Sequence, residues 1–356
     1  MSGFDGKAVV YGASISNKGG TGVYVRRLLE GFVDLGTTGV SVALGEKLMR
    51  PSEALRATPE HGTLRKLLHE HLKAPRLASS ANPDIVHLPA FGGMSPPGFR
   101  YVVTLHDLAF MDRPSSFPLV RSLYYRALFG RLARGATLVM VDSDFTGSEA
   151  ERLLGVASDV VRRVYLSTDD YARPPALFRE RFGVEGDYLI YVGTVEPRKN
   201  VGSLLEAWRK ASASLSVRHL VVAGRWGWGR TKLRSLLETE PGVVWTGELE
   251  EPMLRSAVTG ARLLVYPSLY EGFGLPPLEA ASAGVPSVIG PAEALREVYG
   301  EIAIRARAGD ADSISVAVSR ALDSKVDPEK LREFASRYNP AGMSARVLEV
   351  YGEAAS

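Results

Sequence analysis

The chain has 356 residues, of which 45% are hydrophobic and 23% charged, with a formal net charge of +3 at pH 7. This length suits two domains that each bury a core, and so small a charge gives no support for a nucleic-acid partner. The chain has no cysteine, which excludes disulfides and thiolate metal sites. No apolar run approaches the roughly 18–20 residues that span a bilayer, and the short apolar run behind Asp5 is expected to be a strand rather than a signal peptide. We therefore expect an ordinary soluble protein of the cytoplasm.

Short apolar segments alternate with helical patterns through the first half of the chain. The segments that predict strands are 7–13, 40–44, 84–88, 101–105, 137–141 and 160–166. A glycine loop of Gly19, Gly20 and Gly22 follows the first strand and leads into a helix that closes at Gly36. The loop matches neither a P-loop nor a dinucleotide fingerprint. It is either a tight strand-to-helix turn or a loop whose backbone lies close to an acceptor or a phosphate.

Two basic stretches of the first half are predicted to be helical. Residues 51–80 carry one helical stripe of leucines, and residues 119–134 carry four arginines. Helices of this kind could lie on an anionic membrane surface, which makes the inner face of the membrane an alternative location. Ordinary solvated helix faces explain the same pattern at least as well. The leucines of the stripe are Leu64, Leu67, Leu68 and Leu72.

A second series of alternating elements begins after residues 172–178, which we expect to be an interdomain linker. Strands are predicted at 188–193, 219–224, 243–245, 265–267 and 285–289, and helices at 201–211, 252–259, 278–283 and 340–351. The alternation predicts an α/β protein of two doubly wound parallel-sheet domains, 1–171 and 179–338, with residues 339–356 packing back on the first. Because ligands of such sheets bind at the carboxyl ends of the strands, we expect the site in a cleft between the domains.

The segment 265–289, VYPSLYEGFGLPPLEAASAGVPSVI, carries the strongest functional pattern. A loop with Glu271, Gly272 and Gly274 joins its strand to its helix, and the glycines expose the backbone in front of the helix. The free N–H groups of a helix N-terminus favour a phosphate. Glu271 and Glu279 frame this end, and a carboxylate is a good acceptor for paired sugar hydroxyls. The segment therefore predicts a ligand that carries both phosphate and sugar.

Cationic residues follow two further strands of the second half. Arg198 and Lys199 follow the strand at 188–193, and Arg225 follows the strand at 219–224. Together with the helix N-terminus they make a credible diphosphate site, although solvated loop residues would look similar when taken singly.

His106 directly follows the strand at 101–105 and is the strongest candidate for a functional residue in the first half. A histidine at this edge could donate to a sugar hydroxyl or position an acceptor. The other histidines are expected to be structural, with His87 a candidate for the core and three at the surface: His61, His69 and His71.

These segments resemble the retaining, nucleotide-sugar-dependent glycosyltransferases of the GT-B fold, specifically glycosyltransferase family 4. EGFGLPPLE matches the Glu-x7-Glu element of that family, VGTVEPRKN resembles its diphosphate-binding element, and TLHDLAF resembles the stretch with its active-site histidine. AGRWGWG, SNKGGTGVYVRRLLEGF and VDSDFTGSE also fit, so the likeness covers nearly the whole chain.

The resemblance implies a role for each matched side chain. Glu279 would hold the ribose hydroxyls of the nucleotide, while Glu271 and His106 would contact the donor sugar. Lys199 would neutralise the diphosphate leaving group. Many members carry arginine where this chain has Thr194, and Arg198 is the candidate for the second cation. The backbone of three loop residues would also lie near the sugar or phosphate: Phe273, Gly274 and Leu275.

The resemblance further implies a retaining hexosyltransferase of polysaccharide biosynthesis. The first-choice donor is a GDP-sugar carrying a mannose-like hexose, and the acceptor is a hydroxyl of a glycan or lipid-linked glycan. No carboxylate is placed as a covalent nucleophile, which favours front-face attack with the diphosphate as proton acceptor. No metal or other cofactor is expected, because the donor segment has no Asp-x-Asp. The alternatives are glycosylation of a small natural product, a sugar-nucleotide epimerase or phosphorylase on the same fold, and a non-catalytic nucleotide-sugar-binding protein.

Overall fold

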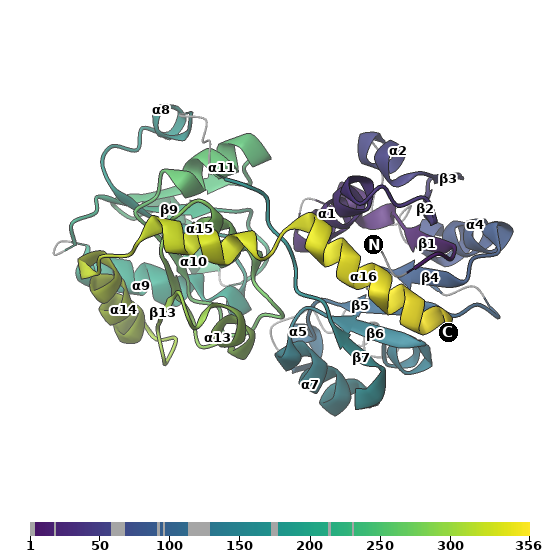
Figure 1. The fold of residues 1–356 in the computed structure, drawn as a ribbon. Coiled ribbons are helices and arrows are strands. Elements are labelled where there is room, and N and C mark those ends of the chain that lie inside the picture. Colours follow the sequence, from purple (N-terminus) through teal and green to yellow (C-terminus); the bar gives the residue numbers. More distant parts are fainter. Residues whose placement is uncertain are drawn as a thin grey trace. The chain divides into compact units, whose positions relative to one another are not determined.

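The structure is a computed structural model that describes residues 4–17, 19–57, 68–90, 93–94, 97–112, 129–171, 177–212, 215–229 and 231–356. The chain divides into two compact units (Figure 1), the first made of Met1–Ser167 with Tyr338–Ser356 and the second of Thr168–Arg337. Each unit is built on its own, mostly parallel sheet, which confirms the predicted α/β class. Of the predicted linker 172–178, only Leu177 and Phe178 lie within the described residues.

The first unit contains a seven-stranded sheet in the order β3-β2-β1-β4-β5-β6-β7. Neighbouring strands are parallel except β2 and β3. Central strands such as β6 are apolar and buried along their whole length, because helices cover both faces of a parallel sheet. The strands are β1 (Ala8–Tyr11), β2 (Val40–Leu44), β3 (Lys47–Met49), β4 (Ile85–Leu88), β5 (Tyr101–Leu105), β6 (Leu138–Val141) and β7 (Val161–Arg163).

The helices of the first unit include one from the far end of the chain. Helix α16 (Pro340–Ala355) packs along α1 (Gly20–Asp34), as Figure 1 shows. A Cβ on Gly31 would lie 2.2 Å from Pro340 O, so only glycine allows this close approach. Ser344 Oγ also donates to Leu28 O at 2.9 Å. The other α-helices among the described residues of this unit are α2 (Pro51–Arg56), α4 (Ala74–Ala81), α5 (Ala109–Asp112) and α7 (Asp144–Leu154).

The basic stretch at 51–80 is helical over Pro51–Arg56 and 68–80, as predicted. Residues 58–67 lie outside the described residues, and the helical part runs from a π-helical turn, His69–Lys73, into α4. Leu68 and Leu72 are 48% and 51% exposed, so these members of the leucine stripe are not buried. His69, predicted at the surface, is only 3% exposed. Most of the second basic stretch, 119–128, and His61 also lie outside the described residues.

The second unit contains a six-stranded parallel sheet in the order β10-β9-β8-β11-β12-β13. The chain order reverses between β8 and β11, and open α/β sheets bind ligands at the carboxyl side of such a switch point. The strands are β8 (Tyr188–Val192), β9 (His219–Ala223), β10 (Val243–Gly247), β11 (Leu263–Tyr266), β12 (Ser287–Ile289) and β13 (Ile304–Arg305).

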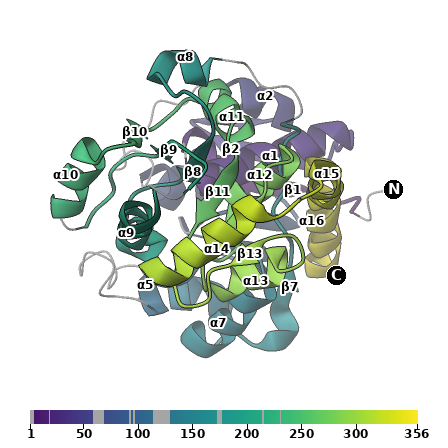
Figure 2. The ribbon, with the colours of Figure 1, turned by 90° about the vertical axis from the view of Figure 1, so that its left-hand side faces the viewer.

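Helices pack on both faces of this second sheet. Figure 2 shows α14 in front of β13 and beside α9, and both contacts are direct. The helices are α8 (Phe178–Phe182), α9 (Val201–Ala211), α10 (Thr231–Thr239), α11 (Glu251–Thr259), α12 (Leu275–Ser282), α13 (Glu293–Tyr299), α14 (Ala311–Asp323) and α15 (Pro328–Ser336). Among the described residues of either unit, no helix is both long and apolar enough to cross a membrane.

Candidate functional site

The loop after β8 brings two cations to the carboxyl edge of the second sheet. Residues Pro197–Lys199 form a 3-10 turn that ends at Asn200, whose φ of 60° is left-handed. Asn200 Nδ2 donates to Gly309 O at 2.6 Å and to Pro267 O at 3.3 Å. The amide of Leu269 donates to Arg198 O at 2.8 Å. These bonds tie the turn to the segments that follow β11 and β13, so the backbone that carries the cations is held in place.

Four charged side chains meet at this edge in a buried group that we call the ion cluster: Glu196, Arg198, Lys199 and Glu271. Lys199 Nζ lies 2.5 Å from Glu271 Oε1, and Arg198 Nη1 lies 3.1 Å from Glu271 Oε2. Arg198 Nε lies 2.5 Å from Glu196 Oε1. The four side chains are only 6–14% exposed. Two acids and two cations balance one another, so the cluster compensates its own buried charges.

Two tyrosines, Tyr266 and Tyr191, pack beside the ion cluster. Lys199 Nζ donates to Tyr266 Oη at 2.6 Å and lies 5.0 Å from the centre of that ring. The ring of Tyr191 stacks on Tyr266 with centroids 6.2 Å apart, and its own hydroxyl donates to Thr194 O at 3.1 Å. Burial raises the pKa of both phenols well above their ordinary value, so both keep their protons.

The electrostatics of the ion cluster keep Glu271 ionised. Burial alone would raise the pKa of Glu271, but Lys199 and Arg198 outweigh it and lower the pKa to about 2. Burial also lowers the pKa of Lys199, which Glu271 opposes. Glu271 therefore acts as a carboxylate that accepts hydrogen bonds and is a poor acid near neutral pH.

The N-terminus of helix α12 adjoins the ion cluster in sequence. Its N-cap, Gly274, has a φ of 86°, and a Cβ there would lie 2.6 Å from Leu295 Cδ2. Tyr299 Oη donates to Gly274 O at 2.7 Å, which fixes the turn from behind. The Phe273 side chain is buried and meets the Tyr299 ring edge-on at 5.9 Å. The buried Phe273 side chain therefore cannot face a ligand, and the contacts that the resemblance implies for the backbone of Phe273, Gly274 and Leu275 stay predictions.

Three other predicted residues lie close to this edge. Glu279 lies in α12, one helical turn beyond its start, and is 7% exposed. Thr194 lies in the loop after β8, and its methyl group would be 2.6 Å from a Cβ on Gly227. The Arg225 side chain is exposed, while its carbonyl accepts from Val195 N at 2.9 Å. The structure brings Arg198, not Arg225, into the ion cluster.

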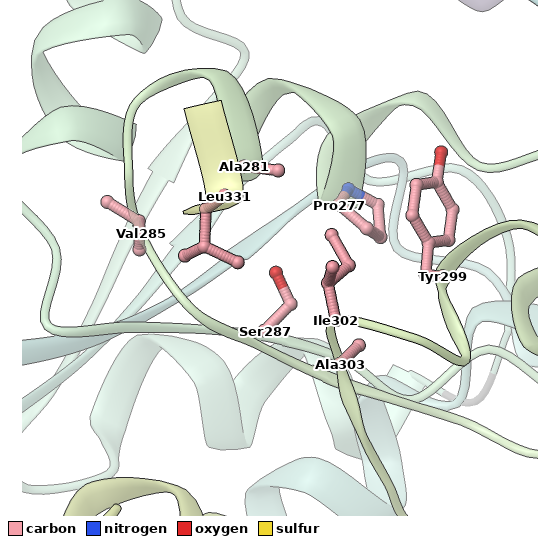
Figure 3. A pocket seen from close by; sticks show the side chains of 8 residues that line it. All are labelled: Pro277, Ala281, Val285, Ser287, Tyr299, Ile302, Ala303 and Leu331. Carbon is pink, nitrogen blue, oxygen red and sulfur yellow. The ribbon is translucent and has the colours of Figure 1, made fainter. Parts of the chain in front are cut away.

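A different part of α12 borders a small, mostly apolar pocket. Figure 3 shows its side chains, among them Pro277 and Ala281 of α12, Tyr299 of α13 and Leu331 of α15. Its lining holds no charged side chain, so it cannot neutralise a phosphate. We therefore take the ion cluster, rather than this pocket, as the candidate site of the second unit.

His106 lies at the carboxyl end of β5 in the first unit, and both of its ring nitrogens are engaged. Nδ1 lies 2.8 Å from Asp142 Oδ2, and Nε2 lies 3.0 Å from Pro89 O. The ring of Tyr24 meets the imidazole edge-on at 4.7 Å. The His106 side chain is 16% exposed, so part of the ring remains accessible. A contact from Nε2 to a sugar, as the resemblance implies, would have to share the proton now donated to Pro89 O.

Sequence reasoning missed Asp142, although the sheet register could have found it. Strands β5 and β6 are parallel, and Leu105 pairs with Val141. The residues that follow this pair, His106 and Asp142, are therefore neighbours at the sheet edge. The VDSDFTGSE segment contains Asp142, but the 36 residues that separate it from His106 concealed the pairing.

The glycine loop after β1 needs glycine for packing at one position, while the contact of its backbone with an acceptor or a phosphate stays a prediction. A Cβ on Gly22 would lie 1.8 Å from Asn17 O, so packing of the turn requires glycine there. Gly19 and Gly20 are exposed, and nothing lies within 4 Å of a Cβ on Gly19. The turn explains Gly22, while Gly19 and Gly20 leave their backbone open to a ligand.

Known proteins share both the sequence and the fold of this chain. Residues 18–170 match the family model "Glycosyltransferase Family 4", and residues 186–324 match "Glycosyl transferases group 1". O-antigen chain mannosyltransferase B of Escherichia coli is 35% identical over 63% of this chain and 61% of its own length. The MMP alpha-(1->4)-mannosyltransferase of Mycolicibacterium hassiacum is 28% identical over 72% of this chain and 66% of its own. The chain thus spans under two thirds of either relative.

Solved structures agree on the fold. HepE from Anabaena, in complex with UDP and glucose, has a TM-score of 0.74 at 16% identity, covering 96% of this chain and 98% of that one. WaaG, a glycosyltransferase involved in lipopolysaccharide biosynthesis, has a TM-score of 0.70 at 17% identity, covering 96% and 99%. With two parallel-sheet units and both family models matched, the chain belongs to the family 4 (group 1) glycosyltransferases of the GT-B fold.

Proposed function

We propose that this protein transfers a hexose from a nucleotide diphosphate sugar to a hydroxyl of a glycan, with retention of configuration. The ion cluster is the main support for this proposal, because it brings Lys199, Arg198 and the carboxylate of Glu271 together at the switch point of the second sheet. The cations can bind a diphosphate, and a carboxylate can accept hydrogen bonds from sugar hydroxyls. Mannose from a GDP-sugar is the first choice, since several relatives are mannosyltransferases and two of them are named for O-antigen chains.

Glu271 neutralises Lys199 and Arg198 in this structure. A diphosphate offers the same cations more charge and more acceptor oxygens than one carboxylate. Donor binding would therefore draw Lys199 and Arg198 towards the diphosphate and release Glu271 to accept hydrogen bonds from the hydroxyls of the sugar. Glu279, a turn along α12, is the candidate acceptor for the ribose hydroxyls.

The chemistry needs charge stabilisation more than a nucleophile from the protein. Glu271 is held by two cations with a pKa of about 2, which makes it a weak nucleophile. In the proposed step the acceptor oxygen bonds to the anomeric carbon on the face from which the diphosphate departs, and the acceptor proton passes to a diphosphate oxygen. Lys199, Arg198 and the N–H groups at the start of α12 would stabilise the negative charge that develops. With cations supplied by side chains, we propose that the reaction needs no metal.

The proposal is tested by measuring nucleotide binding to wild type and three variants with thermal shift or calorimetry. A nucleoside diphosphate at a hundred times its Kd should stabilise the protein by about 2.7 kcal/mol. Lys199→Met should abolish the response. Glu271→Gln should tighten the binding of the bare nucleoside diphosphate, because a competing anion is removed, yet weaken the binding of the nucleotide sugar. Glu196→Gln is the matched control: it also removes an acid from Arg198, but it should change both affinities in the same direction.

Several outcomes would refute parts of this proposal. No response to any nucleotide would reject a nucleotide-sugar site, and equal effects of Glu271→Gln on both ligands would reject its role as a sugar ligand. A response to UDP but not GDP would replace the first-choice donor. Turnover without an acceptor would favour an epimerase or hydrolase over a transferase. The anomeric configuration of the product, determined by NMR, tests retention.

A further inference from the structure

The neighbours of His106 restrict where its ring can carry protons. Pro89 O is a carbonyl and can only accept, so the 3.0 Å contact requires a proton on Nε2. Nδ1 then lies 2.8 Å from Asp142 Oδ2. A second proton on Nδ1 gives a charge-assisted bond to the carboxylate, and the ring becomes an imidazolium held at both ends.

Burial raises the pKa of Asp142, while the charge and the hydrogen bond of His106 oppose that rise and favour the ionised carboxylate. Asp142 is 1% exposed, and its Oδ1 is buried with no hydrogen-bond partner among the described residues. A buried carboxylate with one unsatisfied oxygen depends on a nearby cation, and His106 is the only residue that forms an ion pair with Asp142 within the described ranges.

Other titratable groups surround the ring on each side. Asp107 follows His106 on the same strand end and adds a second negative charge. His87, on β4, is neutral and adds no charge, because burial and, to a smaller extent, His106 lower its pKa to about 3. The Tyr24 phenol on α1 stays protonated, because burial raises its pKa. Burial by itself would lower the pKa of His106, yet Asp142, Pro89 O and Asp107 together outweigh burial and the pKa is raised.

We propose that Asp142 is a positioning residue that holds His106 as a doubly protonated imidazolium, which serves the site as a cation and hydrogen-bond donor and cannot take the proton of the acceptor. The pairing itself stands on the geometry of the first unit. Its link to turnover rests on the proposed glycosyl transfer. If His106 cannot accept a proton, the O–H bond of the acceptor must break towards the departing diphosphate, as the retaining step above requires.

NMR of protein labelled with 15N in histidine tests the pairing without any turnover. The chain has six histidines, and His106→Gln identifies the signals of His106. Wild type should show both His106 nitrogens still protonated at pH values above the ordinary histidine pKa of about 6.5. In Asp142→Asn the amide can donate to Nδ1 instead, so the ring should become neutral with its proton on Nε2. Asp107→Asn, the matched control, removes a nearby charge without touching the ring bond and should keep both protons.

Kinetics then connect the pairing to the reaction. Asp142→Asn should lower kcat more than it changes the KM of the donor, and the cationic fraction of its His106 should fall about tenfold for each pH unit above the lowered pKa. A wild-type spectrum with one bare nitrogen at neutral pH would overturn the proposal, as would an Asp142→Asn spectrum identical to wild type. An inactive wild type with both nitrogens protonated would instead reject the proposed function and leave the pairing standing.

Discussion

The stability of the first unit should fall in acid because of one buried histidine. His87 lies on β4 and is fully buried; its Nδ1 is 2.7 Å from Tyr351 Oη on α16, and its Nε2 is 2.8 Å from Thr104 Oγ1 on β5. Burial, with a smaller contribution from His106, lowers the pKa of His87 to about 3. The ring is therefore neutral and uses one nitrogen as donor and the other as acceptor.

The magnitude follows from proton linkage. In the unfolded chain the same ring titrates near its ordinary pKa of about 6.5. The folded pKa is depressed, so the unfolded state binds more protons, and stability is full above about pH 6.5 and is lost as the pH falls towards 3. At about pH 5 the loss is 1.5 pH units at 1.36 kcal/mol each, or about 2 kcal/mol.

Hydrogen exchange measures this loss in the right part of the molecule. Peptides that cover β4 and α16 report the free energy of opening, once intrinsic exchange rates are corrected for pH. When the pH falls from about 7.5 to about 5, the equilibrium constant for opening should rise roughly 30-fold more in wild type than in His87→Gln. The glutamine amide still offers a donor and an acceptor but does not titrate. The raised pKa of His106 acts in the opposite direction in both proteins and cancels in the comparison. Equal acid sensitivity of the two proteins would refute the reasoning.

Three further predictions concern the second unit and the reaction. Gly274→Ala should destabilise the protein by about 1–3 kcal/mol in thermal unfolding and weaken nucleotide binding, because alanine would have to adopt a φ of 86° and would clash with Leu295. Gly36→Ala is the control: its φ is 64°, but open space surrounds it, so nucleotide affinity should stay unchanged. Tyr299→Phe should cost about 1–2 kcal/mol in denaturant unfolding, since Gly274 O loses its donor, and an unchanged midpoint would contradict that role. Transfer measured by nucleoside diphosphate release should persist in excess EDTA, and a loss restored by Mg²⁺ would show that the side-chain cations do not suffice.

The sequence predicted long, repeated features of the fold well. Continuous apolar runs fixed strands such as β2 and β5 to within a residue, because both faces of a central parallel strand are buried. The short antiparallel strand β3 and the helices α13 to α15 were not predicted, although Ile314, Val318 and Ala321 of α14 recur at helical spacing. The leucine stripe at 51–80 indicated a helix but not what covers it, because helical spacing of apolar residues shows only a face; Leu68 and Leu72 are exposed.

The candidate site shows a similar division. The residue types at the strand ends were identified one by one, but their pairings depend on sheet order, which local patterns do not contain. The contact between Lys199 and Glu271 requires β8 to lie next to β11, although two strands separate them in the chain. The 2.8 Å contact between His106 and Asp142 depends in the same way on β5 lying next to β6.

The return of α16 to the first unit has a consequence for how the chain can be synthesised. The second unit is one continuous stretch, Thr168–Arg337, whereas the first unit is interrupted by all of it. During translation the second unit can therefore fold as soon as it leaves the ribosome. The first unit cannot be completed until α16 has been synthesised. Until then Leu28 and His87 lack their hydrogen-bond partners on α16, Ser344 and Tyr351. A nonsense mutation after Arg337 would spare the later-made unit and harm the earlier one.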